Sequence, residues 1–375
     1  MPTKPRPSIS HCVDINAFTQ TLLKWFLANG RKLPWRQLYD PYQVWISEIM
    51  AQQTQMGRVV PYFERWMGSY PDLESLAEAE EDDVLKLWEG LGYYSRARNI
   101  LKAAKTIRER FNGEFPSSAE DISSLPGIGE YTTGAISSIA FNAPNVCIDA
   151  NVKRVFARLL NMDLPFNAPA FHDRVKGEAE ALLPEGHARE FNQALMELGQ
   201  LVCMKKPVCD MCPVQSFCLS LKRGVVDQRP VPASPREVVK VDVATGVLFH
   251  EGRVLIQKRR PDDVWPGLWE FPGGVIEEGE KPEDTVVREY LEEVELTVEP
   301  VEKITVVKYS YTKYRVTLHC YQCTSLVSAP SPVFHEAVEG CFVQPQQLGQ
   351  YAFPSGHRKL MEHMRGDLRY SQYNF

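Results

Sequence analysis

The sequence predicts a two-domain protein in which an all-α domain is followed by an α+β domain. Its 375 residues fit two domains of ordinary size. Apolar residues recur at helical spacing through residues 14–222, and the alternating pattern of strands begins only after residue 237. Three prolines within Arg229–Pro235 form an extended linker between the two patterns. We therefore expect domains at 1–225 and 241–375, joined by a linker at 226–240.

The first domain shows amphipathic helices separated by Pro and Gly. The helical pattern is clear in Phe18–Phe26, in Val84–Trp88 and in Ile100–Ile107. Prolines at 71, 116 and 126 end these segments, since proline cannot continue a helix. The result is a series of short helices, which predicts an all-α domain.

The second domain mixes strands with one strong helix. The helix is expected over Glu283–Glu293. Four strands are expected, at Val238–Ala244, Arg253–Arg259, Ile304–Tyr309 and Tyr314–Cys320.

The composition is that of an intracellular globular protein. Hydrophobic residues make up 44% of the chain and charged residues 24%. We find neither an apolar run long enough to span a membrane nor a signal-peptide pattern, so we expect no membrane partner and a cytoplasmic location. The net charge of −6 does not decide for or against nucleic acid, because basic runs occur at Arg96–Arg110 and Lys153–Arg158. A monomer is the default expectation.

The segment Leu125–Thr132 combines two glycines with the start of a helix. Gly127 and Gly129 allow a tight turn whose backbone N–H groups point outward, and the following helix N-terminus favours an anion. Such a hairpin can hold a DNA phosphate without reading sequence. An ordinary helix–turn–helix is the alternative.

Four of the nine cysteines lie within sixteen residues. They are Cys203, Cys209, Cys212 and Cys218, separated by five, two and five residues. Their spacing fits one metal centre, either a zinc ion or a [4Fe–4S] cluster. The other five cysteines are scattered, and we interpret them as unligated.

Taken in order, these features resemble the endonuclease III superfamily of DNA glycosylases, and within it the MutY-type adenine DNA glycosylases. The resemblance runs through Leu33–Arg36, Val44–Met50, Gln52–Thr54, Leu91–Arg96, the hairpin, Asp149–Arg154 and Phe191–Gln193. It implies an all-α helix-hairpin-helix glycosylase domain with an iron–sulfur loop, followed by a MutT/Nudix-like domain. The cofactor it implies is a [4Fe–4S] cluster on the four cysteines. One departure is the first cysteine gap, which is five residues instead of six.

Removal of a base from its sugar needs an acid on the base and a negative charge near the sugar. Glu48 lies in an apolar run, where burial should raise its pKa and keep it protonated. Asp149 follows the hairpin and is expected to remain ionised. The alternatives are a buried structural carboxyl for Glu48 and a helix N-cap for Asp149. The resemblance assigns Glu48 as the acid and Asp149 as the carboxylate that stabilises the oxocarbenium-like sugar.

Tyr131 distinguishes two classes of glycosylase. In related bifunctional enzymes a lysine at this place attacks the sugar, which tyrosine cannot do. We therefore expect a monofunctional enzyme that leaves an abasic site. The resemblance places Asn151 beside Asp149 and the water. It places Trp35, Arg36 and Gln193 in the adenine pocket, and Gln53 and Tyr93 at the partner base. The other DNA-binding residues that it implies are Thr54 and the hairpin glycines Gly127 and Gly129.

The second domain contains a nearly complete Nudix box. Glu289, Glu292 and Glu293 share one face of the expected helix and could bind Mg²⁺. The glycine expected after the box is Glu295, and Tyr290 replaces an aliphatic residue. Two hypotheses compete, recognition of 8-oxoguanine without hydrolysis and a Mg²⁺-dependent nucleotide diphosphatase. We favour recognition, with the hydroxyl of Thr312 in a lesion-reading loop.

The sequence thus predicts an N-glycosylase of base excision repair. It is expected to flip out and excise adenine mispaired with 8-oxoguanine or guanine in double-stranded DNA. Enzymes that process abasic sites would act next. The alternative is diphosphatase activity in the second domain.

Overall fold

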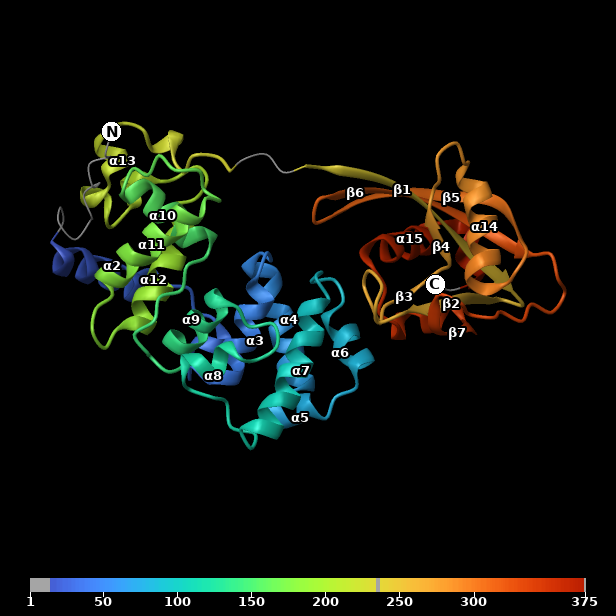
Figure 1. Cartoon of the computed structure of the whole chain (residues 1–375), viewed down its shortest axis with the longest axis horizontal. Coiled ribbons are helices and arrows are strands. Elements are labelled where there is room, and N and C mark those ends of the chain that lie inside the picture. Colours follow the sequence, from blue (N-terminus) through green and yellow to red (C-terminus); the bar gives the residue numbers. More distant parts are fainter. Residues whose placement is uncertain (1–13, 234–236, 374–375) are drawn as a thin grey trace. The chain divides into compact units, whose positions relative to one another are not determined.

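The computed structural model describes residues 14–233 and 237–373 and divides the chain into two compact units (Figure 1). The helical unit comprises Met1–Glu78 and Asn99–Pro235. The sheet unit comprises Ala79–Arg98 and Arg236–Phe375. The expected order of an all-α part followed by an α+β part is confirmed. Residues 79–98, which we expected in the first domain, are part of the sheet unit.

The helical unit consists of short helices around one apolar core. Phe18, Phe156 and Phe191 lie in this core and are fully buried. The elements are α2 (Ile15–Asn29), η1 (Pro34–Arg36), α3 (Pro41–Ala51), α4 (Met56–Ser69), α5 (Leu73–Ala77), α7 (Ser95–Arg110, which begins in the sheet unit), α8 (Ala119–Ser123), α9 (Glu130–Ile139), α10 (Ala150–Leu159), α11 (Pro169–Leu182), α12 (Ala188–Leu201), η2 (Cys209–Met211), η3 (Gln215–Phe217), α13 (Leu219–Lys222) and η4 (Val226–Gln228).

Helix α3 is apolar over nearly its whole length because it crosses the interior of the helical unit. Asp40 caps its first turn by accepting a hydrogen bond from the Gln43 backbone N–H at 2.9 Å, and Pro41 occupies the first helical position. Every residue from Val44 to Met50 is buried. This helix therefore carries Glu48 into the interior.

The sheet unit is built on seven strands. Their order is β3-β2-β1-β6-β5, with β4 paired to β1 and β7 paired to β2. Strands β1 and β6 run parallel, with Val243 opposite Leu318, and the other pairs are antiparallel. The elements are α6 (Glu81–Trp88), β1 (Val239–His250), β2 (Arg253–Arg259), β3 (Trp269–Glu270), β4 (Gly273–Val275), α14 (Pro282–Val294), β5 (Val298–Tyr311), β6 (Tyr314–Ser325), β7 (Ala337–Val343), η5 (Pro345–Gln350), α15 (Ser355–Gly366) and η6 (Leu368–Tyr373).

The sheet is covered by a helix on each face. Successive residues of a strand point to opposite faces. Accordingly Val247 of β1 packs in a core with Leu360 of α15, whereas Leu248 packs in a second core with Tyr290 of α14. Strand β2 has the expected bounds, whereas β1, β5 and β6 are longer than the sequence predicts because their outer ends also pair. Strands β3, β4 and β7 were not expected.

Helix α6 and the residues after it are bound to the C-terminal part of the sheet unit. The buried carboxylate of Glu89 accepts a hydrogen bond from the Phe353 backbone N–H at 3.0 Å and forms ion pairs with Lys86 at 2.6 Å and with Arg358 at 2.9 Å. The Tyr94 hydroxyl donates to the Phe353 carbonyl at 3.0 Å. These bonds explain why a segment from the first half of the sequence belongs to the second unit.

The expected linker of 226–240 is partly ordered against its neighbours. The Phe166 backbone N–H donates to the Val231 carbonyl at 3.2 Å, and β1 already begins at Val239. Of the helices in the described parts of the chain, none combines the length and the apolar character that a membrane crossing needs.

Candidate active site

The helical unit contains a cleft of about 1050 Å³. Its walls come from η1, the end of α3 and the loop after it, the start of α9, the start of α10 and the end of α12. Eight of the expected site residues line this cleft together, namely Trp35, Arg36, Glu48, Gln53, Thr54, Tyr131, Asp149 and Asn151.

Glu48 is buried in this cleft and bonded to Tyr131. The Tyr131 hydroxyl donates to Oε2 of Glu48 at 2.6 Å. Burial raises the pKa of the Glu48 carboxyl, and the nearby Asp149 adds to the rise, whereas the bond from Tyr131 and the charge of Arg36 lower it. The pKa of Tyr131 is raised well above its ordinary value, chiefly by burial and then by Glu48. The tyrosine therefore remains a donor at neutral pH.

Asp149 has more hydrogen-bond donors than Glu48. It is the N-cap of α10, and its Oδ1 accepts from the Val152 backbone N–H at 2.7 Å. Its Oδ2 accepts from the side-chain amide of Asn151 at 2.5 Å. Burial raises the pKa of Asp149, while these bonds lower it. The N-cap alternative is thus confirmed as a structural role, and the same carboxylate faces the cleft.

Asn151 also links Asp149 to the cysteine loop. Its Oδ1 accepts from Nη2 of Arg154 at 2.8 Å, and Nε of Arg154 donates to the Cys203 carbonyl at 2.8 Å. The position of the Asp149 carboxylate is therefore fixed by bonds that extend to the backbone of Cys203.

Gln193 is placed differently from the other expected pocket residues. It is buried in α12, and its amide donates to the Tyr39 hydroxyl at 3.3 Å and to the Arg189 carbonyl at 3.2 Å. It is not among the described residues that line the cleft. Gln53, in contrast, lines the cleft with a left-handed backbone, at φ 56°.

The glycine hairpin between α8 and α9 has the expected backbone. Gly127 has φ +76°, and a Cβ at this position would come within 2.5 Å of the Asn99 Cβ. Gly129 is the N-cap of α9, which begins at Glu130, within the segment Leu125–Thr132 where a helix start was expected. The first N–H groups of α9 therefore follow the hairpin directly, as an anion site requires.

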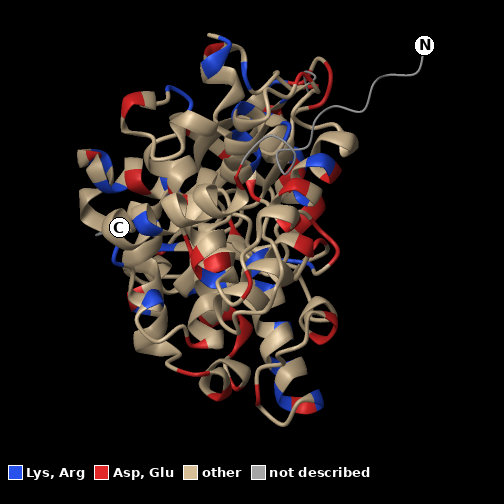
Figure 2. Cartoon of the chain, turned by 90° about the vertical axis from the view of Figure 1, so that its left-hand side faces the viewer, with Lys and Arg blue, Asp and Glu red and all other residues tan. Residues whose placement is uncertain are grey.

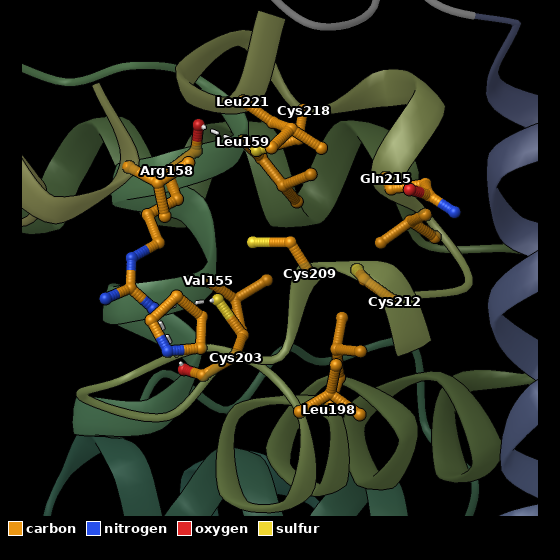
Figure 3. Close-up of a pocket in the computed structure, with 14 residues that line it drawn as sticks. Val155, Arg158, Leu159, Leu198, Cys203, Cys209, Cys212, Gln215, Cys218 and Leu221 are labelled. Carbon is orange, nitrogen blue, oxygen red and sulfur yellow. Dashed lines mark hydrogen bonds between the residues drawn. The ribbon is translucent and has the colours of Figure 1, made fainter. Parts of the chain in front are cut away.

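The four clustered cysteines surround one cavity. Cys203, Cys209, Cys212 and Cys218 line it together with apolar side chains such as Val155 and Leu198 (Figure 3). Nη1 of Arg158 donates to Sγ of Cys203 at 3.3 Å. In the described residues no three His, Cys, Asp or Glu side chains converge as ligands of a single ion. Four thiols around one cavity are a ligand set for a zinc ion or for a [4Fe–4S] cluster.

Charge is mixed along the whole chain. Figure 2 shows Lys and Arg interspersed with Asp and Glu along the ribbon.

In the sheet unit, aromatic rings gather at the tip of the β5–β6 hairpin. Thr312 lies at this tip with φ 49°. The ring of the preceding Tyr311 lies 6.4 Å from Tyr93 and 5.0 Å from Trp265. Tyr93 and the loop with Thr312 are thus neighbours, as expected if both serve one base. Trp265, at φ 58°, was not anticipated from the sequence.

The Nudix-box carboxylates are bonded to protein groups. Arg288 binds Glu280 at 3.0 Å, Glu289 at 2.8 Å and Glu292 at 3.1 Å. Oε2 of Glu293 accepts from the Gly273 backbone N–H at 3.0 Å. Burial raises the pKa of Glu293 well above its ordinary value. The three helix carboxylates therefore do not form a joint metal site among the described residues.

Comparisons with known proteins agree with this arrangement. Residues 46–165 match a family described as HhH-GPD superfamily base excision DNA repair protein, and residues 244–363 match a NUDIX domain. The chain is 38% identical over 258 residues to an adenine DNA glycosylase of Buchnera aphidicola subsp. Baizongia pistaciae, covering 68% of this chain and 73% of that protein. The chain belongs to the adenine DNA glycosylase family.

The chain is also similar to a second member of this family and to one solved structure of another DNA glycosylase. The mouse adenine DNA glycosylase is 34% identical over 331 residues, which cover 74% of this chain and 64% of the mouse protein. The structure of a thermostable thymine-DNA glycosylase is similar with a TM-score of 0.50 and 28% identity, covering 56% of this chain and 97% of that one.

Sequence reasoning did not identify the buried ion network beside Glu48. Glu197 of α12 binds both Arg31 and Arg36, and all three residues line the cleft. The available signal was the charged residue at 197, which lies in an otherwise apolar stretch of α12. A single charge in such a run predicts a buried partner without saying which one.

Proposed function

We propose that this protein removes adenine mispaired with 8-oxoguanine or guanine from double-stranded DNA and leaves an abasic site. The observation that carries the proposal is the bond between Tyr131 and the buried Glu48 in a cleft that Asp149 shares. A carboxyl with raised pKa, a second carboxylate with several donors and a tyrosine in place of a nucleophilic lysine suit hydrolysis without a covalent enzyme–sugar link.

In the proposed reaction, Glu48 transfers its proton to a ring nitrogen of adenine. The N-glycosidic bond then breaks, and its electron pair leaves with the protonated base. Asp149 stabilises the positive charge that develops on the sugar. Water adds to the anomeric carbon, and the proton it releases returns to a carboxylate of the cleft. Atoms and charge balance, and the phosphodiester chain stays intact.

The remaining cleft residues would bind the extruded nucleotide. Trp35 and Arg36 border the cleft beside Glu48 and are proposed to hold adenine. Asn151 is proposed to hold Asp149 and the attacking water, as its bond to Asp149 supports. Gln193 is buried and would influence the adenine pocket through its hydrogen bond to the Tyr39 hydroxyl.

Outside the adenine pocket, we propose three contacts with DNA. Gln53 and Thr54 would contact the strands at the mouth of the cleft. Gly127 and Gly129 would bind a phosphate through backbone N–H groups. Tyr93 would stack at the partner base, where the Thr312 hydroxyl would bind 8-oxoguanine. No specific observation favours a nucleotide diphosphatase, because the box carboxylates are already bonded to protein donors.

We also propose that Cys203, Cys209, Cys212 and Cys218 bind a [4Fe–4S] cluster. The resemblance to MutY-type enzymes and the common cavity support this. The cluster would hold the loop together, while Arg158 places positive charge beside the Cys203 sulfur. Iron and sulfide analysis of the purified protein should give about four of each per chain. A zinc content near one with little iron would exclude the cluster.

The function is tested by single-turnover cleavage of labelled duplexes containing A:8-oxoguanine, A:G or A:T, without added metal. Strand breaks should appear only after alkali treatment and only in the mispaired duplexes. Glu48→Gln should release adenine at least a hundredfold more slowly, in the range typical of a lost general acid, and still bind DNA. Glu64→Gln, an exposed glutamate of α4, is the matched control. Undiminished release by Glu48→Gln would disprove the assignment of the acid.

A further inference from the structure

Two arginines and one glutamate form a buried network on the wall of the cleft that contains Glu48. Glu197 has no exposed surface. Its Oε1 accepts from Nη2 of Arg31 at 2.8 Å and lies 2.8 Å from Nη2 of Arg36, and its Oε2 accepts from Nε of Arg31 at 2.9 Å. One carboxylate therefore binds two guanidinium groups.

The network determines where Arg36 lies. Besides Glu197, Arg36 donates from Nη1 to the Arg31 carbonyl at 3.0 Å, and its guanidinium lies 5.6 Å from the centre of the Phe26 ring. These contacts fix the arginine from three sides. A planar guanidinium held in this way has one orientation with respect to the cleft.

The network also determines the charge beside Glu48. Arg36 is the positive group that lowers the pKa of Glu48, and Tyr131 and Asp149 are its other polar neighbours. The buried Cys147 thiol lies in the same surroundings. Without Glu197, Arg36 beside the acid would lose its buried counter-charge, and so would the neighbouring Arg31.

We propose that Glu197 is a positioning residue that holds Arg36 in the adenine pocket and offsets the two arginines so that Glu48 keeps its proton. This inference rests on the proposed function of Glu48 as the acid. It assigns to α12 a part in proton transfer, which Glu197 would exert through Arg36.

The test compares the alkaline limb of the pH–rate profile in four proteins, using single-turnover release of adenine from an A:8-oxoguanine duplex. In Glu197→Gln the uncompensated positive charge should move this limb to lower pH by about one unit, because an added positive charge favours the ionised carboxyl. In Arg31→Gln the limb should move to higher pH. In the double variant Glu197→Gln/Arg31→Gln the limb should return to that of the wild type, because the net charge of the network is restored.

A role in packing alone gives a different pattern. It predicts equal slowing at all pH values in Glu197→Gln, and a double variant no better than the worse single variant, and either result would overturn the inference. If Glu197→Gln does not fold, Arg31→Gln still tests the proposal, because a limb that does not move contradicts it. Wild-type protein that releases no adenine would refute the proposed function instead, so the two failures are distinguishable.

Discussion

At the scale of single residues, the bond from Tyr131 to Glu48 joins the discriminating tyrosine to the proposed acid. We predict that Tyr131→Phe slows adenine release by roughly ten- to a hundredfold, since a hydrogen bond to a charged group contributes about 1.5–3 kcal/mol. The bond lowers the pKa of Glu48, so its loss should move the alkaline limb of the pH–rate profile to higher pH. Single-turnover assays from pH 5 to 10 measure both the rate of adenine release and the position of the alkaline limb. A limb that moves to lower pH would contradict this account.

Individual site residues could be predicted from the sequence where their chemistry conflicts with their surroundings. Glu48 is a charged residue inside the apolar helix α3, and Asp149 precedes a helix as a capping residue does. Arg31 and Glu197 could not be paired in this way, because they are 166 residues apart in the sequence. Their interaction depends on the packing of α12 against the start of the chain, which one sequence does not reveal.

At the scale of elements, the hairpin before α9 depends on the backbone of Gly127. We predict that Gly127→Ala weakens binding to mispaired and matched duplexes alike, because φ +76° disfavours a side chain and the new Cβ would lie 2.5 Å from the Asn99 Cβ. The strain alone is about 1–2 kcal/mol. Fluorescence anisotropy at several salt concentrations measures the loss. Gly68→Ala in α4, where no atom lies within 4 Å of the new Cβ, should leave binding unchanged.

Helix α15 carries a second element-scale prediction. Nδ1 of the buried His357 accepts a hydrogen bond from the Phe271 backbone N–H at 3.2 Å, and burial lowers the pKa of His357 to about 3. The unfolded chain binds a proton near pH 6.5, but the folded chain does not. The stability that a neutral His357 gives is therefore complete above pH 6.5 and falls by about 1.4 kcal/mol per pH unit below it.

The corresponding experiment is chemical unfolding of the sheet unit between pH 7 and pH 4. His357→Asn keeps an acceptor close to the place of Nδ1 and removes the titrating ring. This variant should be less stable at pH 7 and less sensitive to acid than the wild type. Equal sensitivity of both proteins to acid would show that other groups cause the loss.

The periodicity of the sequence predicted the type of each element better than its ends. Strand β2 has the expected bounds, whereas β1 continues to His250 and β5 starts at Val298. The extra residues are paired with neighbouring strands, and pairing across a sheet leaves no local signal. Helix α14 has nearly the expected bounds and ends at Val294. The residue after it, Glu295, has a left-handed backbone with φ 52° at the position where the Nudix pattern has glycine.

At the scale of the whole molecule, the division into units depends on Glu89. Replacing this buried carboxylate leaves Lys86 and Arg358 without their shared partner and the Phe353 N–H without its acceptor. We predict that Glu89→Ala destabilises the sheet unit by about 3 kcal/mol. Thermal unfolding measures the change. Glu362→Ala, which removes the exposed partner of Arg358 at 3.6 Å, should cost less than about 1 kcal/mol.

The order of the two folds was predictable from the sequence, but the course of the chain between them was not. The change of period and the proline-rich segment separate helices from strands. Residues 79–98 have the same helical pattern as their neighbours, and their attachment to the sheet unit depends on single polar bonds such as that of Tyr94 to Phe353. Such bonds between distant residues follow from the folded geometry alone.

The bond between Glu89 and Phe353 has a consequence for how the protein is made. The two residues are 264 positions apart, so α6 leaves the ribosome on the order of tens of seconds before its partner is synthesised. During that interval the apolar and charged side chains of this segment lack the partners that they contact in the folded sheet unit. A chain that ends at the proline-rich segment would never gain these partners. We therefore expect chaperones to recognise such a shortened chain, and the completed protein to escape them only when its last helix has been translated.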